Sequence, residues 1–115
     1  MSDRPLQAPA FLVLTALAGP PQHGYGVIED VLRISEGRVK LHTGSLYAVL
    51  DRLREAGLIE VDREEVVASR LRRYYRLTSA GAERLASETE QMRHNASVAA
   101  GRLRKLRPAG EAGAL

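Results

Sequence analysis

The feature of this chain that most limits its fold is the order in which its hydrophobic patterns follow one another. Three stretches with helical spacing come first, then two stretches in which apolar and polar residues alternate, and finally one long helical stretch. Helical spacing gathers residues three and four apart on one face, whereas alternation gathers every second residue on one face of a strand. The order therefore predicts a mainly α fold (α+β) with a small β-hairpin before a long last helix.

The first helical stretch starts at Ala8 and is apolar around most of its circumference, with Phe11 and Leu12 among its large side chains. A helix of this kind must be buried on more than one side. In a chain of only 115 residues, the second side is a candidate contact with another subunit. Gly19 and two prolines end this helix, residues 22–25 open the next one, and Glu36-Gly37 end that one.

The third helix is predicted over residues 43–56. Leu46, Leu50 and Leu53 fall at helical spacing and form its inward stripe. Thr43 is expected to cap its start, because a threonine hydroxyl can accept hydrogen bonds from the free amides of the next turn. Gly57 is expected to end it in a left-handed conformation.

The two alternating stretches predict a β-hairpin. Ile59 and Val61 share one face, with Glu60, Asp62 and Glu64 on the other, and Tyr75 and Leu77 alternate with Tyr74 and arginines. Tyr75 is expected in the core and Tyr74 on the surface. The connecting residues EEVVAS are expected to be irregular, because no Asn-Gly or Asp-Gly pair marks the turn.

The last helix, with Thr78 or Ser79 as its cap, carries apolar and small residues at alternating spacings of three and four. This is the seam of a coiled coil, and at about 1.5 Å per residue the helix would reach about 40 Å, beyond what a small domain covers alone. The residues of the seam are Ala82, Leu85, Thr89, Met92, Ala96, Ala99, Leu103 and Leu106. The pattern predicts a C-terminal dimerisation helix over residues 79–107.

Helix, helix, turn, helix and hairpin, in this order, are typical of a winged helix-turn-helix domain. The strings LTALAGPPQHGYGVIEDV, GSLYAVLDRLREAGLIE and LRRYYRLTSAG resemble the PadR family of bacterial transcriptional regulators, over roughly residues 8–92. The resemblance implies a homodimeric, sequence-specific DNA-binding regulator, most often a repressor. The chain departs from the family pattern at Ser45, where Thr is common, at Ala48, where Pro is common, and at Ser69 and Leu71, which replace Gly and Pro.

The expected organisation is a DNA-binding domain over 8–78 and the dimerisation helix over 79–107, with flexible segments at 1–7 and 108–115. The helix 43–56 would enter the major groove of double-stranded operator DNA, and the wing 62–73 would lie on the flanking backbone. The predicted DNA-contacting residues are Lys40, His42, Thr43, Gly44, Ser45, Tyr47, Arg52, Arg70 and Arg72. Alternatively, Thr43 only caps the helix and Tyr47 packs partly inside the domain. Arg76, in the second strand of the hairpin, is expected to have a structural role.

The predicted dimerisation residues are apolar or small, and they lie on the first and last helices. They are Phe11, Leu12, Leu85, Met92, Ala96, Ala99 and Leu103. A two-fold dimer would place its recognition helices about 34 Å apart, on successive major grooves. Two alternatives remain open: a regulator that senses a small-molecule effector at the dimer interface, and a winged-helix module that binds another protein.

Composition excludes several other classes of function. Lys plus Arg total 17 and Asp plus Glu total 14, a net charge of +3 that gathers in two basic segments, 38–54 and 91–107. The chain has no cysteine, and His23, His42 and His94 lie in separate elements, so no metal site or cofactor is expected. No arrangement of residues suggests catalysis, and no apolar run is long enough to cross a membrane. We therefore expect a cytoplasmic protein that is not an enzyme.

Overall fold

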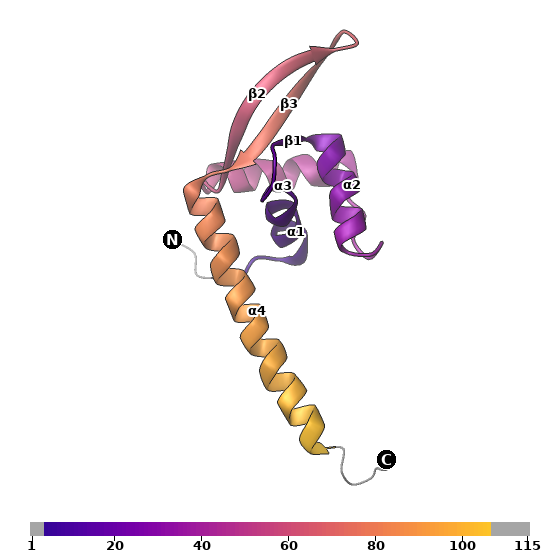
Figure 1. Ribbon diagram of the computed structural model, residues 1–115. Helices are drawn as coiled ribbons and strands as arrows, with labels where there is room; N and C mark the ends of the chain where they lie inside the picture. The colour runs from indigo at the N-terminus through magenta and orange to yellow at the C-terminus, as the bar shows by residue number, and fades with distance from the viewer. Residues whose placement is uncertain (1–3, 107–115) are drawn as a thin grey trace. The chain divides into compact units, whose positions relative to one another are not determined.

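The computed structural model describes residues 4–106 (Figure 1). The chain divides into two units between Leu85 and Ala86. The elements are α1 (Ala8–Ala16), β1 (Gln22–His23), α2 (Gly24–Ile34), α3 (Thr43–Glu55), β2 (Ile59–Val67), β3 (Arg70–Leu77) and α4 (Ser79–Leu106). The predicted mainly α fold with a β-hairpin and a long last helix is therefore confirmed. The segments predicted to be flexible, 1–7 and 108–115, lie outside the described residues except for positions 4–7.

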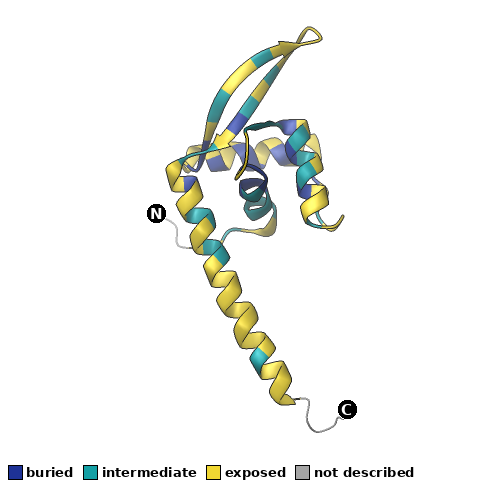
Figure 2. Ribbon diagram, viewed as in Figure 1, coloured by how far each residue is buried: buried dark blue, intermediate teal, exposed yellow. Residues whose placement is uncertain are grey.

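The core of the first unit forms where α1, α2 and α3 meet and where the sheet joins them (Figure 2). The predicted inward stripe of α3 is confirmed, because Leu46 and Leu50 are fully buried and Leu53 is only 4% exposed. Tyr75 of β3 is buried as expected. Each such side chain stabilises the fold by about 1.5–3 kcal/mol relative to an exposed position. This burial fixes which side of α3 remains open to a partner.

Two helices of the first unit end in the same left-handed turn. At the end of α3, the Gly57 amide donates to the Arg54 carbonyl at 2.9 Å and the Leu58 amide donates to the Leu53 carbonyl at 3.0 Å. Gly57 has φ 78°, so the glycine predicted to end this helix does so. At the end of α2 the left-handed position belongs to Glu36, with φ 55°, and Gly37 follows it.

The start of α3 differs from the prediction. His42, not Thr43, occupies the N-cap position, and no side chain there hydrogen-bonds to the first amides of the helix. Thr43 is the first helical residue, so the prediction that it caps the helix is wrong. The backbone N–H groups of this first turn have no intrahelical partner, and they remain available to an anion.

The sheet has three antiparallel strands in the order β1-β3-β2. The strand β1 was not expected from the sequence, which suggested instead that residues 22–25 open a helix. Gln22 and His23 pair with Tyr75 and Tyr74, and a strand of two residues is too short to show alternation. Its existence depends on β3, a partner more than fifty positions away in the chain.

The hairpin is more regular than predicted at its tip and less regular at its base. β2 continues to Val67 and β3 starts at Arg70, so the expectation that EEVVAS is irregular is wrong. Ala68 and Ser69 form a two-residue turn with φ 51° and 65°, the positive values that suit the twist of a hairpin.

At the base of the hairpin, the register of β2 shifts between Val61 and Arg63. A bulge of this kind reverses which side chains share a face. Glu60 therefore pairs with Arg76, whereas Glu64 pairs with Arg73 on the opposite face of the hairpin. The predicted shared face of Glu60 and Glu64 is wrong for this reason.

Thr78 caps α4; it is one of the two candidates, Thr78 and Ser79, that the sequence offered for this role. Its hydroxyl accepts a hydrogen bond from the Gly81 amide at 3.0 Å and donates one to the Gly57 carbonyl at 2.7 Å. The Thr78 amide also donates to the Leu58 carbonyl at 3.1 Å. The first turn of α4 is therefore fixed against the turn that joins α3 to β2.

Candidate nucleic-acid interface

The exposed side of α3 is uncharged at its start. Thr43, Gly44, Ser45 and Tyr47 are all exposed, while Leu46 between them is fully buried. The first acidic residue of the helix is Asp51, in its second half. The N-terminal half of α3 thus offers hydroxyl groups and free amides to a partner, with no carboxylate to repel a phosphate.

Basic side chains precede this helix. Lys40 and His42 are both exposed in the connector that leads to α3, whereas Leu41 between them is buried. A helix N-terminus favours negative charge, because its backbone N–H groups and its dipole both point outward. The cation of Lys40 and the uncapped helix start therefore attract the same kind of ligand, an anion such as a phosphate.

Tyr47 is exposed, as a DNA contact requires, and is also partly packed against its own domain, as in the alternative prediction. Its side chain is 42% exposed, yet its hydroxyl lies against the first turn of α2, where a Cβ added to Gly24 would come within 2.8 Å of the hydroxyl oxygen. Gly24 itself is buried. The glycine makes room for the tyrosine, and α2 thereby fixes the direction of a side chain on the exposed part of α3.

Most of the charge on the wing is neutralised within the hairpin. Arg63 binds Asp62 and Glu65, Arg73 binds Glu64, and Arg76 binds Glu60 and Asp62, with N–O distances of 2.7–3.3 Å. Arg70 and Arg72 form no ion pair with any residue between positions 4 and 106. These two arginines are the ones chosen from the sequence as phosphate contacts, and the ion pairs of Arg76 agree with the structural role expected for it.

Tyr74 connects the wing to the helices. The Arg63 guanidinium lies 4.0 Å from the centre of the Tyr74 ring, and the His23 ring meets that ring edge to face at 5.3 Å. His23 also caps α2, because its Nδ1 accepts a hydrogen bond from the Gly26 amide at 3.4 Å. Burial, with a further contribution from Arg72, lowers the pKa of His23. The role of Arg63 was not expected from the sequence, because it depends on the bulge beside it.

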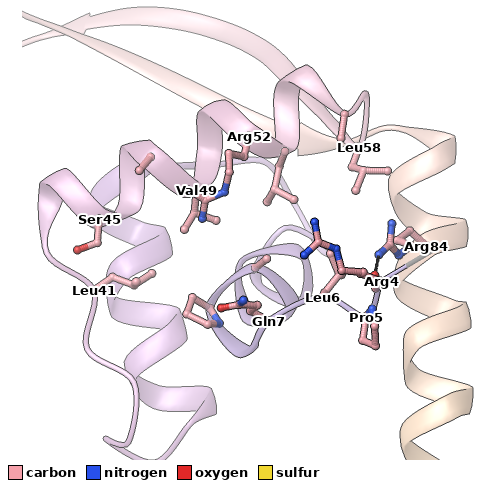
Figure 3. A pocket seen from close by; sticks show the side chains of 15 residues that line it. Arg4, Pro5, Leu6, Gln7, Leu41, Ser45, Val49, Arg52, Leu58 and Arg84 are labelled. Atoms are coloured by element: carbon pink, nitrogen blue, oxygen red, sulfur yellow. Dashed lines mark hydrogen bonds between the residues drawn. The ribbon is translucent and has the colours of Figure 1, made fainter. Parts of the chain in front are cut away.

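Arg52 lies on a different side of α3 from Tyr47. It lines a pocket of about 610 Å³ formed by the N-terminal segment, the start of α1, α3 with the residues that flank it, and Arg84 of α4. Figure 3 shows Arg4, Arg52 and Arg84 reaching this pocket from three separate segments, with Arg84 Nη2 donating to the Arg4 carbonyl at 2.7 Å. No local pattern in the sequence indicates this pocket, because its walls are far apart in the chain.

The residues predicted to dimerise divide between the two units. In the first unit, Phe11, Leu12 and Leu85 are half-buried, and Leu12 and Leu85 pack against the core of their own chain. In the second unit, the remaining predicted residues are all exposed along α4. These are Met92, Ala96, Ala99 and Leu103.

Within residues 4–106, no group of three His, Asp or Glu side chains could hold a metal ion. None of the helices in this range is long and apolar enough to span a membrane.

Comparison with known proteins places these features in a family. A family model described as the transcriptional regulator PadR-like family matches residues 13–87, which is most of the chain. No curated protein matches the sequence.

Solved structures show the same fold. A PadR family transcription regulator from Clostridium difficile R20291 is 23% identical with a TM-score of 0.69, over 84% of this chain and 99% of that one. A PadR family transcriptional regulator from Eggerthella lenta DSM 2243 is 27% identical with a TM-score of 0.64, over 84% and 80%. Bacillus subtilis PadR, solved in complex with operator DNA, is 18% identical with a TM-score of 0.63, over 70% of this chain and 47% of that one.

The members of the matched family are transcriptional regulators, so the prediction that the chain is not an enzyme is confirmed. The winged helix-turn-helix fold inferred from the order of its helices and strands is confirmed as well. From the family model and the shared fold, the chain belongs to the PadR-like family of transcriptional regulators.

Proposed function

We propose that this regulator binds a two-fold operator as a homodimer and represses transcription. In this proposal α3 enters the major groove through its N-terminal half, and the wing rests on the flanking backbone through Arg70 and Arg72. The observation that carries the proposal is the uncapped, acid-free start of α3, with Lys40 and His42 just before it. A major groove admits one helix, and the free amides at the helix start suit a neighbouring phosphate.

The pattern of charge on the wing supports the same orientation. Three of its arginines are paired with carboxylates, so the positive charge left for DNA is that of Arg70 and Arg72. Phosphate contacts orient a protein on DNA, while contacts with base edges provide sequence specificity. We therefore assign orientation to the wing arginines and to Lys40, and base reading to Ser45 and Tyr47.

A second copy of the chain supplies the two-fold symmetry. Met92 and Leu103 are apolar, lie on the same predicted seam of α4, and are 43% and 61% exposed. Exposed apolar side chains in one row favour a partner helix with the same row. The small residues Ala96 and Ala99 between them would let the two helices approach closely.

The test is DNA binding measured as a function of salt. Fluorescence anisotropy with DNA from upstream of the protein's own gene should give specific binding that weakens steeply with salt, because phosphate contacts release counterions. A random duplex of equal length is the control. Binding that does not change with salt, or that does not distinguish the two duplexes, would contradict the proposal and favour a protein-interaction module.

Repression has its own test. In transcription in vitro from the upstream promoter, added protein should reduce the transcript in proportion to operator occupancy. An increase in the transcript would show that the protein activates, while leaving DNA binding itself unaffected.

A further inference from the structure

The pocket beside α3 has an apolar floor. Leu41, Val49, Leu53 and Leu58 line it, and each is less than 10% exposed. Its volume of about 610 Å³ falls within the range of sites for small molecules, about 300–1,000 Å³. A pocket of this size with an apolar floor has room for an organic molecule, not only for water.

The rim of the pocket is positively charged. Arg4, Arg52 and Arg84 come from the N-terminal segment, α3 and α4, and none of the fifteen residues that line the pocket is acidic. The hydrogen bond from Arg84 to the Arg4 carbonyl keeps two of these arginines beside each other. A guanidinium group binds a carboxylate through two parallel hydrogen bonds, which makes it suited to an organic anion.

The lining also limits the shape of the ligand. All of its apolar side chains are aliphatic, and no aromatic residue lines the pocket. A flat ring would find no partner for stacking there, whereas a flexible aliphatic chain can follow the leucine and valine side chains. We propose that this pocket binds a carboxylate with an aliphatic tail, the carboxylate on Arg52 and the tail on the apolar floor.

The position of the pocket connects the ligand to DNA binding. Ser45, Ala48 and Arg52 of α3 form part of its wall, and the same helix is proposed above to enter the major groove. A ligand in the pocket would place bulk beside Ser45, a residue to which the proposed function assigns base reading. This coupling, unlike the binding of the ligand itself, rests on the proposed function.

Binding of the ligand is tested without DNA. Calorimetric titration of the full-length protein with sodium octanoate should show saturable binding at one site per chain, and octan-1-ol should bind at least about tenfold more weakly, a difference of about 1.4 kcal/mol. Equal binding of octanoate and octanol, or no saturable binding of octanoate, would overturn the proposal.

Variants locate the site. Arg52→Met removes the guanidinium and keeps an apolar stem, and it should weaken octanoate binding about tenfold, or about 1.4 kcal/mol. Ala48→Leu fills the pocket from an exposed position and should weaken binding without altering any charge. Arg102→Met, at an exposed position of α4 outside this pocket, is the matched control and should bind octanoate normally.

A second copy of the chain is the alternative occupant of the pocket. In that case octanoate affinity would fall as the protein concentration rises through the range of dimerisation, and this result would overturn the proposal. If octanoate binds but leaves DNA affinity unchanged, the coupling is wrong and the ligand site stands. If octanoate binds and no DNA is bound at any salt concentration, the proposed function fails and the ligand site still stands.

Discussion

The backbone of Gly81 lies directly against the carbonyl oxygen of Leu58, so that a Cβ at position 81 would come within 1.9 Å of that oxygen. The contact joins the first turn of α4 to the residue that follows the left-handed turn after α3. Both atoms belong to rigid backbone, and Thr78 ties the same two segments together through Gly57. A side chain at position 81 therefore cannot be accommodated by a rotamer change alone.

Gly81→Ala should destabilise the protein by about 3 kcal/mol, the upper part of the range for overpacking, because α4 must shift away from Leu58. Urea denaturation measures the loss. Gly19→Ala is the control, since a Cβ at position 19 would meet nothing within 4 Å. Equal stability of the two variants would show that the start of α4 moves freely.

Arg72→Ala should weaken DNA binding and reduce the slope of log affinity against log salt by about 1, the change expected for one lost phosphate contact. Arg76→Ala is the matched variant from the same strand. Its guanidinium is already paired with Glu60, so the substitution should leave the slope unchanged and change stability little, as the loss of an exposed ion pair does. Loss of the same slope in both variants would contradict the assignment.

Glu36→Gly should stabilise the protein by about 1 kcal/mol, because Glu36 holds a φ of 55° in which its Cβ is crowded by the backbone. Thermal or urea unfolding measures the gain. Gly37→Ala provides the opposite case, since φ 83° at that position penalises any side chain and should lower stability. A destabilising Glu36→Gly would mean that the glutamate side chain has a role beyond the turn.

Stability should fall as the solution is acidified through the titration of His23. Burial lowers the pKa of His23 below its ordinary value of 6.5, so the unfolded chain binds the proton more readily than the folded one. The neutral ring is also the form whose Nδ1 accepts the Gly26 amide. The stabilisation is therefore complete above pH 6.5 and is lost as the pH falls through the lower pKa of the folded state.

The measurement is the urea midpoint from pH 5 to about 7.5, a range that brackets an ordinary histidine. His23→Asn keeps a capping side chain that does not titrate, and this variant should lose most of the pH dependence over that range. An unchanged pH dependence in the variant would assign the effect to other groups.

Leu103→Glu should convert the proposed dimer into a monomer, because a carboxylate would replace an apolar contact on the seam of α4. Light scattering measures the mass. Val98→Glu is the control, since Val98 is a neighbouring apolar residue of the same helix, 40% exposed, that lies off the seam. A dimer that survives Leu103→Glu and dissociates with Val98→Glu would place the interface on another face.

The identity and the order of the long elements are specified by local patterns in the amino-acid sequence. The inward stripe of α3, the turn at Gly57 and the burial of Tyr75 all follow from hydrophobic spacing and from local backbone preference. These are effects that neighbouring residues impose on one another, so they are visible in a short window of the chain. The choice of Arg70 and Arg72 over Arg76 as phosphate contacts was also possible from the sequence. The acidic residues of β2, which can form ion pairs with arginines of β3, lie in the same short window of the chain.

The remaining features depend on contacts between segments that are distant in the chain. The strand at Gln22-His23 exists because β3 offers it an edge, and the bulge after Val61 changes which acids face which arginines. The start of α3 is uncapped although a threonine stands beside it, because the helix begins one residue earlier than that cap requires. The pocket that joins Arg4, Arg52 and Arg84 is formed by segments up to eighty positions apart. Such contacts depend on how distant surfaces meet, which hydrophobic spacing within one segment does not specify.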